Sequence, residues 1–180
     1  GVDFIFVGGS LIANSINELI ISIKKITHLP VLIFPGNAIQ VTENADAILF
    51  LSLISGRNPE FLIGNHVVAA PFLKKSNIEV ISTGYILVES GVQTSVEYMS
   101  NTKPIPFNKT DIAIATALAG EMLGNKLIYL EAGSGASKTV SPEMITEVKK
   151  NISIPLIVGG GMKTKSDIEN IFCKGVTTFM

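Results

Sequence analysis

Seven short apolar segments recur along the chain and constrain its fold more than any other feature. Each is apolar almost throughout and rich in β-branched or aromatic residues, which is typical of parallel strands buried on both faces. Most of the gaps between them leave room for a helix that returns the chain to the same edge of a sheet. The predicted strands cover residues 3–7, 31–34, 47–53, 79–82, 127–130, 155–158 and 176–180.

Apolar residues at helical spacing fill most of these gaps. Polar caps or prolines open the predicted helices, and glycines close two of them. The five helices begin at Asn14 or Ser15, at Asn58-Pro59, at Thr110, at Ser141-Pro142 and at Thr164, and Gly124 and Gly175 are the closing glycines. The gap at 35–46 is too short for a full helix with its turns, so we expect a short or extended segment there.

Parallel strands joined by helices form either a doubly wound sheet or a closed (β/α)8 barrel. Glycine-rich or polar residues follow nearly every predicted strand, at 8–10, 35–36, 55–58, 83–85, 131–135 and 159–161. A doubly wound sheet would concentrate them at one switch point, whereas a barrel carries them all around its carboxyl end. We therefore predict a single α/β domain over 1–180, a partial (β/α)8 TIM barrel. A whole barrel takes about 250 residues and eight strands, so we expect its first strand to lie upstream of this chain.

Charge and composition exclude several classes of protein. The 180 residues include 14 Lys and Arg against 15 Asp and Glu, a net charge of −1, without the basic excess of a nucleic-acid-binding surface. Charged or polar residues interrupt every apolar run before the roughly 18 residues that a membrane helix needs. A single cysteine, Cys173, excludes an internal disulfide, and no signal peptide is recognisable. We expect a cytoplasmic protein that binds no nucleic acid.

Three consecutive glycines, Gly159, Gly160 and Gly161, follow the sixth predicted strand and precede a helix. Backbone N–H groups of such a turn can close on an anion, and the loops after the last strands of (β/α)8 barrels commonly hold a phosphate. A tight turn without a ligand is the alternative. Gly133-Ser134-Gly135, after the preceding strand, would face the same phosphate.

Tyr129 and Glu131 flank Leu130, so their side chains point to the same side of a strand. At the carboxyl end of a barrel strand that side is the interior, where Glu131 would bind a hydroxyl group or act as a general base. The alternative is a structural carboxylate that accepts a hydrogen bond from a nearby backbone amide. Ser10 offers a hydroxyl to a hard cation such as Mg²⁺, or caps a helix.

Six motifs coincide with the predicted strands and the residues that follow them. They are 6–10 (FVGGS), 34–36 (FPG), 51–59 (LSLISGRNP), 82–87 (STGYIL), 129–136 (YLEAGSGA) and 158–161 (VGGG). Together they resemble the geranylgeranylglyceryl phosphate synthase family. The resemblance implies a barrel modified at its third helix and a Mg²⁺-dependent prenyltransferase. Such an enzyme joins geranylgeranyl diphosphate, or a similar prenyl diphosphate, to the C3 hydroxyl of sn-glycerol 1-phosphate in the first committed step of ether-lipid biosynthesis.

The resemblance also implies roles for individual residues. Glu131 and Tyr129 become the catalytic residues, and Ser10 becomes a ligand of Mg²⁺. The substrate-binding residues are Tyr129, Leu130, Glu131, Ala132, Gly133, Ser134, Gly135, Gly159, Gly160 and Gly161. Tyr85 and residues 34–36 are candidates for an apolar trench around the prenyl tail, with ordinary core packing as the alternative. Two family motifs have no counterpart in this chain, the metal-binding Asp after the first strand and a Gly-Asn pair after the eighth.

The implied partners are sn-glycerol 1-phosphate, a prenyl diphosphate, further copies of the chain in a homo-oligomer and, for the lipid product, a membrane surface. Two other functions stay open at this point. An FMN-dependent barrel oxidoreductase would use the same terminal phosphate site, and its purified protein would be yellow. A non-catalytic barrel would bind the phosphate or the prenyl lipid without turnover.

Overall fold

The computed structural model describes residues 2–9, 12, 15–172, 176 and 178–179. Its strands are β1 (Ile5–Gly9), β2 (Val31–Pro35), β3 (Ala47–Leu53), β4 (Glu79–Leu87), β5 (Leu127–Glu131), β6 (Leu156–Gly159) and β7 (Thr178–Phe179). The strand order in the sheet follows the chain, and every pair with a defined register is parallel. The helices are α1 (Ile16–Lys24), α2 (Asn65–Lys75), α3 (Ser95–Ser100), α4 (Thr110–Met122), α5 (Pro142–Asn151) and α6 (Lys165–Phe172). The predicted alternation of parallel strands and helices is confirmed.

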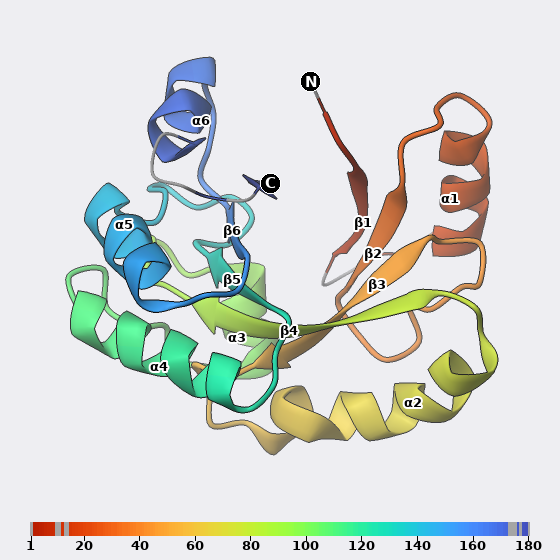
Figure 1. The fold of residues 1–180 in the computed structure, drawn as a ribbon, viewed down its shortest axis with the longest axis horizontal. Helices are drawn as coiled ribbons and strands as arrows, with labels where there is room; N and C mark the ends of the chain where they lie inside the picture. Colours follow the sequence, from red (N-terminus) through yellow and green to blue (C-terminus); the bar gives the residue numbers. More distant parts are fainter. Residues whose placement is uncertain (1, 10–11, 13–14, 173–175, 177, 180) are drawn as a thin grey trace. The chain divides into compact units, whose positions relative to one another are not determined.

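The chain divides into two compact units, one of Gly1–Leu51 and Ile63–Ile81, the other of Ser52–Leu62 and Ser82–Met180. In the first unit, α1 packs against β1 and β2 (Figure 1). Ser15 is the N-cap of α1, as predicted, because its side chain accepts the N–H of Glu18 at 3.4 Å. The buried core of this unit consists of Val7, Ile20, Val31, Ile33, Ala45, Ile48, Ala69, Leu73 and Ile78.

The segment between β2 and β3 contains no helix, which confirms the prediction for this gap. Hydrogen bonds of the Gln40 and Thr42 side chains hold this segment instead. The Gln40 side chain accepts the N–H of Gly36 at 2.8 Å and donates to the carbonyl of Gly9 at 2.9 Å. The Thr42 hydroxyl donates to the Asn17 side chain at 2.5 Å. These bonds tie the segment to β1 and α1 without a helix.

The helix predicted to begin at Asn58-Pro59 is divided in two. Asn58 accepts the N–H of Glu60 through its side chain at 3.1 Å and opens a π-helical turn, η1 (Glu60–Gly64). Only then does α2 begin, with Pro71 in its interior. The predicted opening residue is therefore right, but the regular helix starts later than expected.

In the second unit, α4 and α5 lie side by side, and α4 packs against β5 (Figure 1). Ser141 caps α5 by accepting the N–H of Met144 at 3.1 Å, and Pro142 occupies its first turn, as predicted. Gly124 follows α4 with φ +91°, a conformation that glycine adopts without strain. The predicted N-cap alternative Asn14 and the predicted ends of the last helix and strand at 173–175, 177 and 180 lie outside the described residues.

Two elements of the second unit differ from the predictions. β4 continues to Leu87, so residues 83–85, expected as a loop, are part of the strand. The short helix α3 has no counterpart among the predicted helices, because its six residues carry no apolar repeat long enough to recognise. Among the described residues, no helix is both long and apolar enough to span a bilayer.

Candidate active site

Tyr129 and Glu131 lie at the carboxyl end of β5, where the alternation of side chains along the strand places both on one face. Both are buried, with 0% and 5% of their surfaces exposed. Leu130 and Ala132 pack into the apolar core of the second unit. Their side chains are therefore unavailable to a polar ligand, and only their backbone groups could contact one.

The Glu131 carboxylate accepts the N–H of Gly133 through Oε1 at 2.5 Å, so the bond to a backbone amide expected of a structural carboxylate is present. Burial raises the pKa of Glu131 from its ordinary value of 4.5 to about 7. Hydrogen bonds from Gly133, Tyr129 and Tyr85 oppose the shift without cancelling it, because each stabilises the ionised form. A carboxyl group with this pKa exchanges a proton at neutral pH.

Tyr85, a candidate for the prenyl trench with core packing as the alternative, is a neighbour of Glu131. It lies opposite Tyr129 in the register of β4 and β5, and the two ring centroids are 5.5 Å apart. Burial, and then the charge of Glu131, raise the pKa of Tyr85 well above its ordinary value. The same two causes raise the pKa of Tyr129. Both phenols therefore keep their protons and can donate to the carboxylate.

The three glycines after β6 fit closely against the residues at the end of β5. Glu131 is paired with Gly159 in the register, and a Cβ on Gly159 would overlap the Tyr129 hydroxyl. Gly160 and Gly161 have φ of +82° and +74°. In the part of the chain that the structure describes, the N–H groups of Gly160 and Gly161 have no hydrogen-bond acceptor. Such N–H groups are what a bound phosphate requires.

The Gly133-Ser134-Gly135 turn meets this glycine turn, as the sequence analysis expected. A Cβ on Gly160 would lie 2.6 Å from the backbone nitrogen of Gly133. Ser134 and Gly135 themselves are exposed. The structure thus brings Tyr129, Glu131 and Gly133 together with Gly159 and Gly160.

Thr94, which the sequence analysis did not single out, lies on the other side of Gly133. A Cβ on Gly133 would lie 2.7 Å from the Thr94 Cβ, and the Thr94 hydroxyl is buried without a partner among the described residues. Thr94 is the N-cap residue of α3, yet its side chain makes no capping bond. Only the Thr-Ser pair at 94–95, typical of helix starts, marks this position in the sequence.

The structure does not test the Mg²⁺ site expected at Ser10. Ser10 itself lies outside them, and within them no three His, Cys, Asp or Glu side chains lie together in a way that could hold a metal ion. Mg²⁺ prefers a set of oxygen ligands that includes carboxylates. The Mg²⁺ site at Ser10 therefore stays a prediction, and no chemical step below is derived through the ion.

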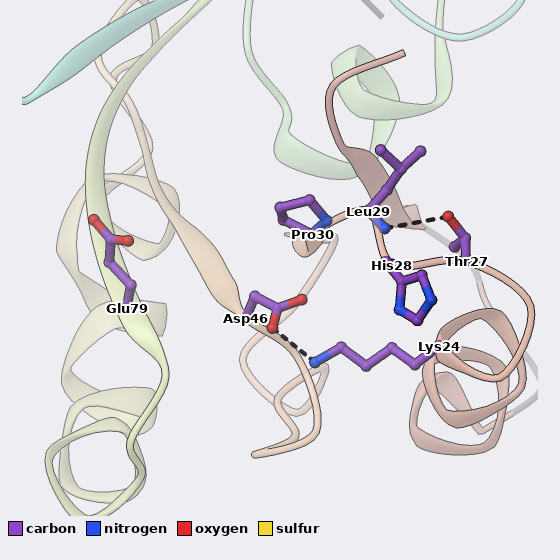
Figure 2. Close-up of a pocket in the computed structure, with 7 residues that line it drawn as sticks. All are labelled: Lys24, Thr27, His28, Leu29, Pro30, Asp46 and Glu79. Atoms are coloured by element: carbon purple, nitrogen blue, oxygen red, sulfur yellow. Dashed lines mark hydrogen bonds and ion pairs between the residues drawn. The ribbon is translucent and has the colours of Figure 1, made fainter.

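A cavity of about 470 Å³ lies in the first unit, at the amino ends of strands (Figure 2). Lys24 and Asp46 form an ion pair at 2.8 Å on its wall, and Glu79 is the first residue of β4. Asp46 also accepts the N–H of Val31 at 2.7 Å through Oδ2. Residues at the amino ends of barrel strands serve stability, whereas the chemistry belongs to the carboxyl ends, where Glu131 lies.

Comparisons with known proteins show which family the chain resembles. A family model described as the PcrB family matches residues 1–174. The geranylgeranylglyceryl phosphate synthase of Chitinophaga pinensis is 55% identical over 163 residues, which cover 90% of this chain and 65% of that protein. The protein of the same name from Flavobacterium johnsoniae is 57% identical over 172 residues, which cover 95% of this chain and 71% of that protein.

A solved structure extends the comparison to the fold. It is that of (S)-3-O-geranylgeranylglyceryl phosphate synthase from Thermoplasma acidophilum, in complex with its substrate sn-glycerol-1-phosphate. It matches with a TM-score of 0.94 at 36% identity and covers 99% of this chain and 72% of that one. The predicted (β/α)8 barrel class of α/β fold is thereby confirmed. The chain spans 65% of the length of the Chitinophaga pinensis protein. It belongs to the PcrB family.

Proposed function

We propose that this chain carries the active site of a prenyltransferase that joins geranylgeranyl diphosphate, or a similar prenyl diphosphate, to sn-glycerol 1-phosphate. The observation that carries the proposal is the buried Glu131 carboxyl, whose pKa of about 7 suits proton transfer, beside the N–H groups of Gly160 and Gly161, which have no acceptor among the described residues. The relatives that bear the synthase name, and the related structure with bound sn-glycerol-1-phosphate, support the choice of substrate.

In this proposal the phosphate of glycerol phosphate binds the N–H groups of Gly160 and Gly161. The C3 hydroxyl lies at Glu131. The oxygen of this C3 hydroxyl forms a bond to C1 of the prenyl group while the bond from C1 to the diphosphate oxygen breaks. The hydroxyl proton passes to Glu131, and diphosphate leaves with the electron pair of the broken bond.

The bond from Gly133 to Glu131 is compatible with this role. A carboxylate has two oxygens and about four acceptor sites, so one amide bond does not exhaust it. Because the pKa of about 7 lies near neutrality, a large part of the Glu131 population is ionised and ready to accept a proton at physiological pH.

We also propose that the activity depends on Mg²⁺, with Ser10 as one ligand. When bound, the ion would neutralise charge on the leaving diphosphate. Addition of excess chelator should abolish product formation, and Ser10→Ala should weaken it only in part, because a neutral hydroxyl contributes less than a carboxylate. Full turnover in chelator would show that the metal assignment is wrong.

The test of the main proposal is product formation by the full-length protein. We expect the prenyl ether to form from sn-glycerol 1-phosphate and a series of prenyl diphosphates, and product masses identify the preferred chain length. Glu131→Gln should lower kcat by about 100-fold or more. Binding of glycerol phosphate without product would support a non-catalytic barrel, and a yellow protein with bound flavin would support an FMN oxidoreductase.

The remaining proposals concern assembly and location. We propose a cytoplasmic homo-oligomer that meets a membrane surface when the lipid product leaves. Several large apolar side chains on η1 and α2 are exposed and support self-association, namely Ile63, Val67, Val68 and Phe72. Light scattering after chromatography should give a mass above one chain, and Val68→Lys should reduce it. Flotation with lipid vesicles tests the membrane contact.

A further inference from the structure

We propose that Tyr85 is a positioning residue for Glu131. The phenol hydroxyl of Tyr85 holds the Glu131 carboxylate in the orientation that receives the proton of the C3 hydroxyl of glycerol phosphate. The inference rests on the proposed function, because it assigns a role within the same reaction. It differs from the two earlier expectations, that Tyr85 lines a trench for the prenyl tail or packs in the core.

The register of the strands places the phenol within reach of the carboxylate. Tyr85 of β4 is paired with Tyr129 of β5, and Leu87 is paired with Glu131. Tyr85 is therefore the diagonal neighbour of Glu131 across the two parallel strands. Neighbouring strands are about 4.8 Å apart and two residues advance about 6.6 Å along a strand, so the two backbone positions are about 8 Å apart, a distance that a tyrosine side chain bridges. The hydroxyl of Tyr85 makes its hydrogen bond to Glu131.

Two contacts fix the carboxylate from different directions. The N–H of Gly133 binds Oε1 from the turn that follows β5, and the Tyr85 hydroxyl donates from β4. Tyr85 is only 6% exposed, so water cannot easily take the place of its hydroxyl. Donors on two sides restrict the orientation of the carboxylate.

Packing alone does not require a hydroxyl at this position. The Tyr85 ring lies 5.5 Å from the Tyr129 ring, and phenylalanine would keep that contact. Burying a hydroxyl group lowers the stability of a protein unless the group makes a hydrogen bond. The hydroxyl of Tyr85 makes its hydrogen bond to Glu131, the proposed base. The hydroxyl therefore serves the carboxylate rather than the core.

The surroundings of Glu131 make the effect of Tyr85 measurable. Among the described residues, the titratable groups that act on the carboxyl are the phenols of Tyr129 and Tyr85. Gly159 and Gly160, which approach from β6, carry no ionisable group. Loss of one phenol donor should therefore raise the pKa of Glu131 without interference from another nearby charge.

The experiment compares Tyr85→Phe with the parent in the full-length protein. We expect the acid limb of the kcat profile to move about one pH unit upward, so that kcat falls about tenfold near pH 6 and recovers near pH 9. The KM for the prenyl diphosphate should stay within about twofold. Tyr98→Phe is the matched control, because Tyr98 is 73% exposed on α3 and should change nothing.

Two further measurements keep the outcome clear. Adding Tyr85→Phe to Glu131→Gln should not lower kcat further, because the residue being positioned has already lost its function. Titration of the Glu131 carboxyl carbon by NMR should show the same upward shift in Tyr85→Phe and needs no turnover. It therefore tests the contact even if the parent forms no prenyl ether and the proposed function fails. The inference is overturned if the pKa of Glu131 is the same in Tyr85→Phe and the parent. It is also overturned if Tyr85→Phe changes the KM for the prenyl diphosphate or the preferred prenyl chain length while the acid limb stays in place.

Discussion

A methyl group on Gly160 would lie 2.6 Å from the carboxylate oxygen Oε1 of Glu131. The turn after β6 and the carboxylate at the end of β5 are thus in direct contact. The same methyl group would meet the backbone of Gly133, also at 2.6 Å. The two turns can approach each other only while position 160 has no side chain.

Gly160→Ala should therefore weaken the binding of glycerol phosphate and destabilise the protein. The backbone strain at φ +82° and the overlap together should cost about 1–3 kcal/mol of unfolding free energy. Titration calorimetry and urea denaturation measure the two effects. Gly124→Ala is the control, because Gly124 has φ +91° with nothing within 4 Å of its Cβ position and lies at the other end of β5. Equal loss of binding in both variants would contradict the prediction.

Glu131 should cost the protein stability above neutral pH. Because its folded pKa is raised from 4.5 to about 7, the folded state holds a proton that the unfolded state has already released between these values. Unfolding free energy therefore falls as the pH rises from about 4.5 to 7, by roughly 3 kcal/mol in all. In Glu131→Gln this fall should be absent, as measured by urea denaturation at pH 5 and pH 8. Exposed Glu43, changed to Gln, should keep the parent's profile.

His66 should make the protein less stable in acid. It is buried edge-on against Phe50, with ring centroids 4.4 Å apart, and burial lowers its pKa, although a hydrogen bond with Leu51 opposes the shift. Below its ordinary pKa of 6.5 the unfolded state takes up a proton that the folded state resists, so unfolding free energy falls with falling pH. His66→Gln should flatten this part of the profile in thermal melts. If exposed His28→Gln flattens it equally, His66 is not the cause.

Asp46→Asn should reduce stability slightly and leave the reaction unchanged. The pair with Lys24 is partly exposed, with 36% and 44% of the two side chains accessible, so its loss should cost less than about 1 kcal/mol. Burial raises the pKa of Asp46, but the hydrogen bonds from Lys24 and Val31 outweigh it and leave the pKa lowered. A large fall in kcat/KM without a change in the melting temperature would show that the cavity in Figure 2 takes part in function.

The sequence was sufficient to predict features that depend on local chemistry. Ala47–Leu53 is a strand with the predicted bounds, and Ser141-Pro142 opens a helix, because each depends on residues next to it in the chain. The triple glycine was also recognisable, and so were Tyr129 and Glu131. Side chains alternate between the two faces of a strand, which puts Tyr129 and Glu131 on the same face. That they act as a site stays a prediction until the variants above are measured.

The role of Tyr85 could not be obtained in this way. Whether its hydroxyl meets Glu131 depends on the register between β4 and β5, which no local pattern specifies. The extension of β4 through Tyr85 was missed for a related reason. Gly84 resembles the start of a loop, but its missing side chain leaves room for Ile54, Ile128 and Asn125, which approach its Cβ position to 2.9 Å. The prediction therefore ended this strand at Ser82, whereas the structure continues it to Leu87.

The contact between Tyr129 and Gly159 also limits how this family can diverge. A side chain at 159 would occupy the space that the Tyr129 hydroxyl fills, so the two cannot be present together while β5 and β6 keep their register. A relative with a larger residue at the position of Gly159 must have lost the phenol at the position of Tyr129 as well. We therefore expect the two positions to covary across the family, with tyrosine accompanied by glycine.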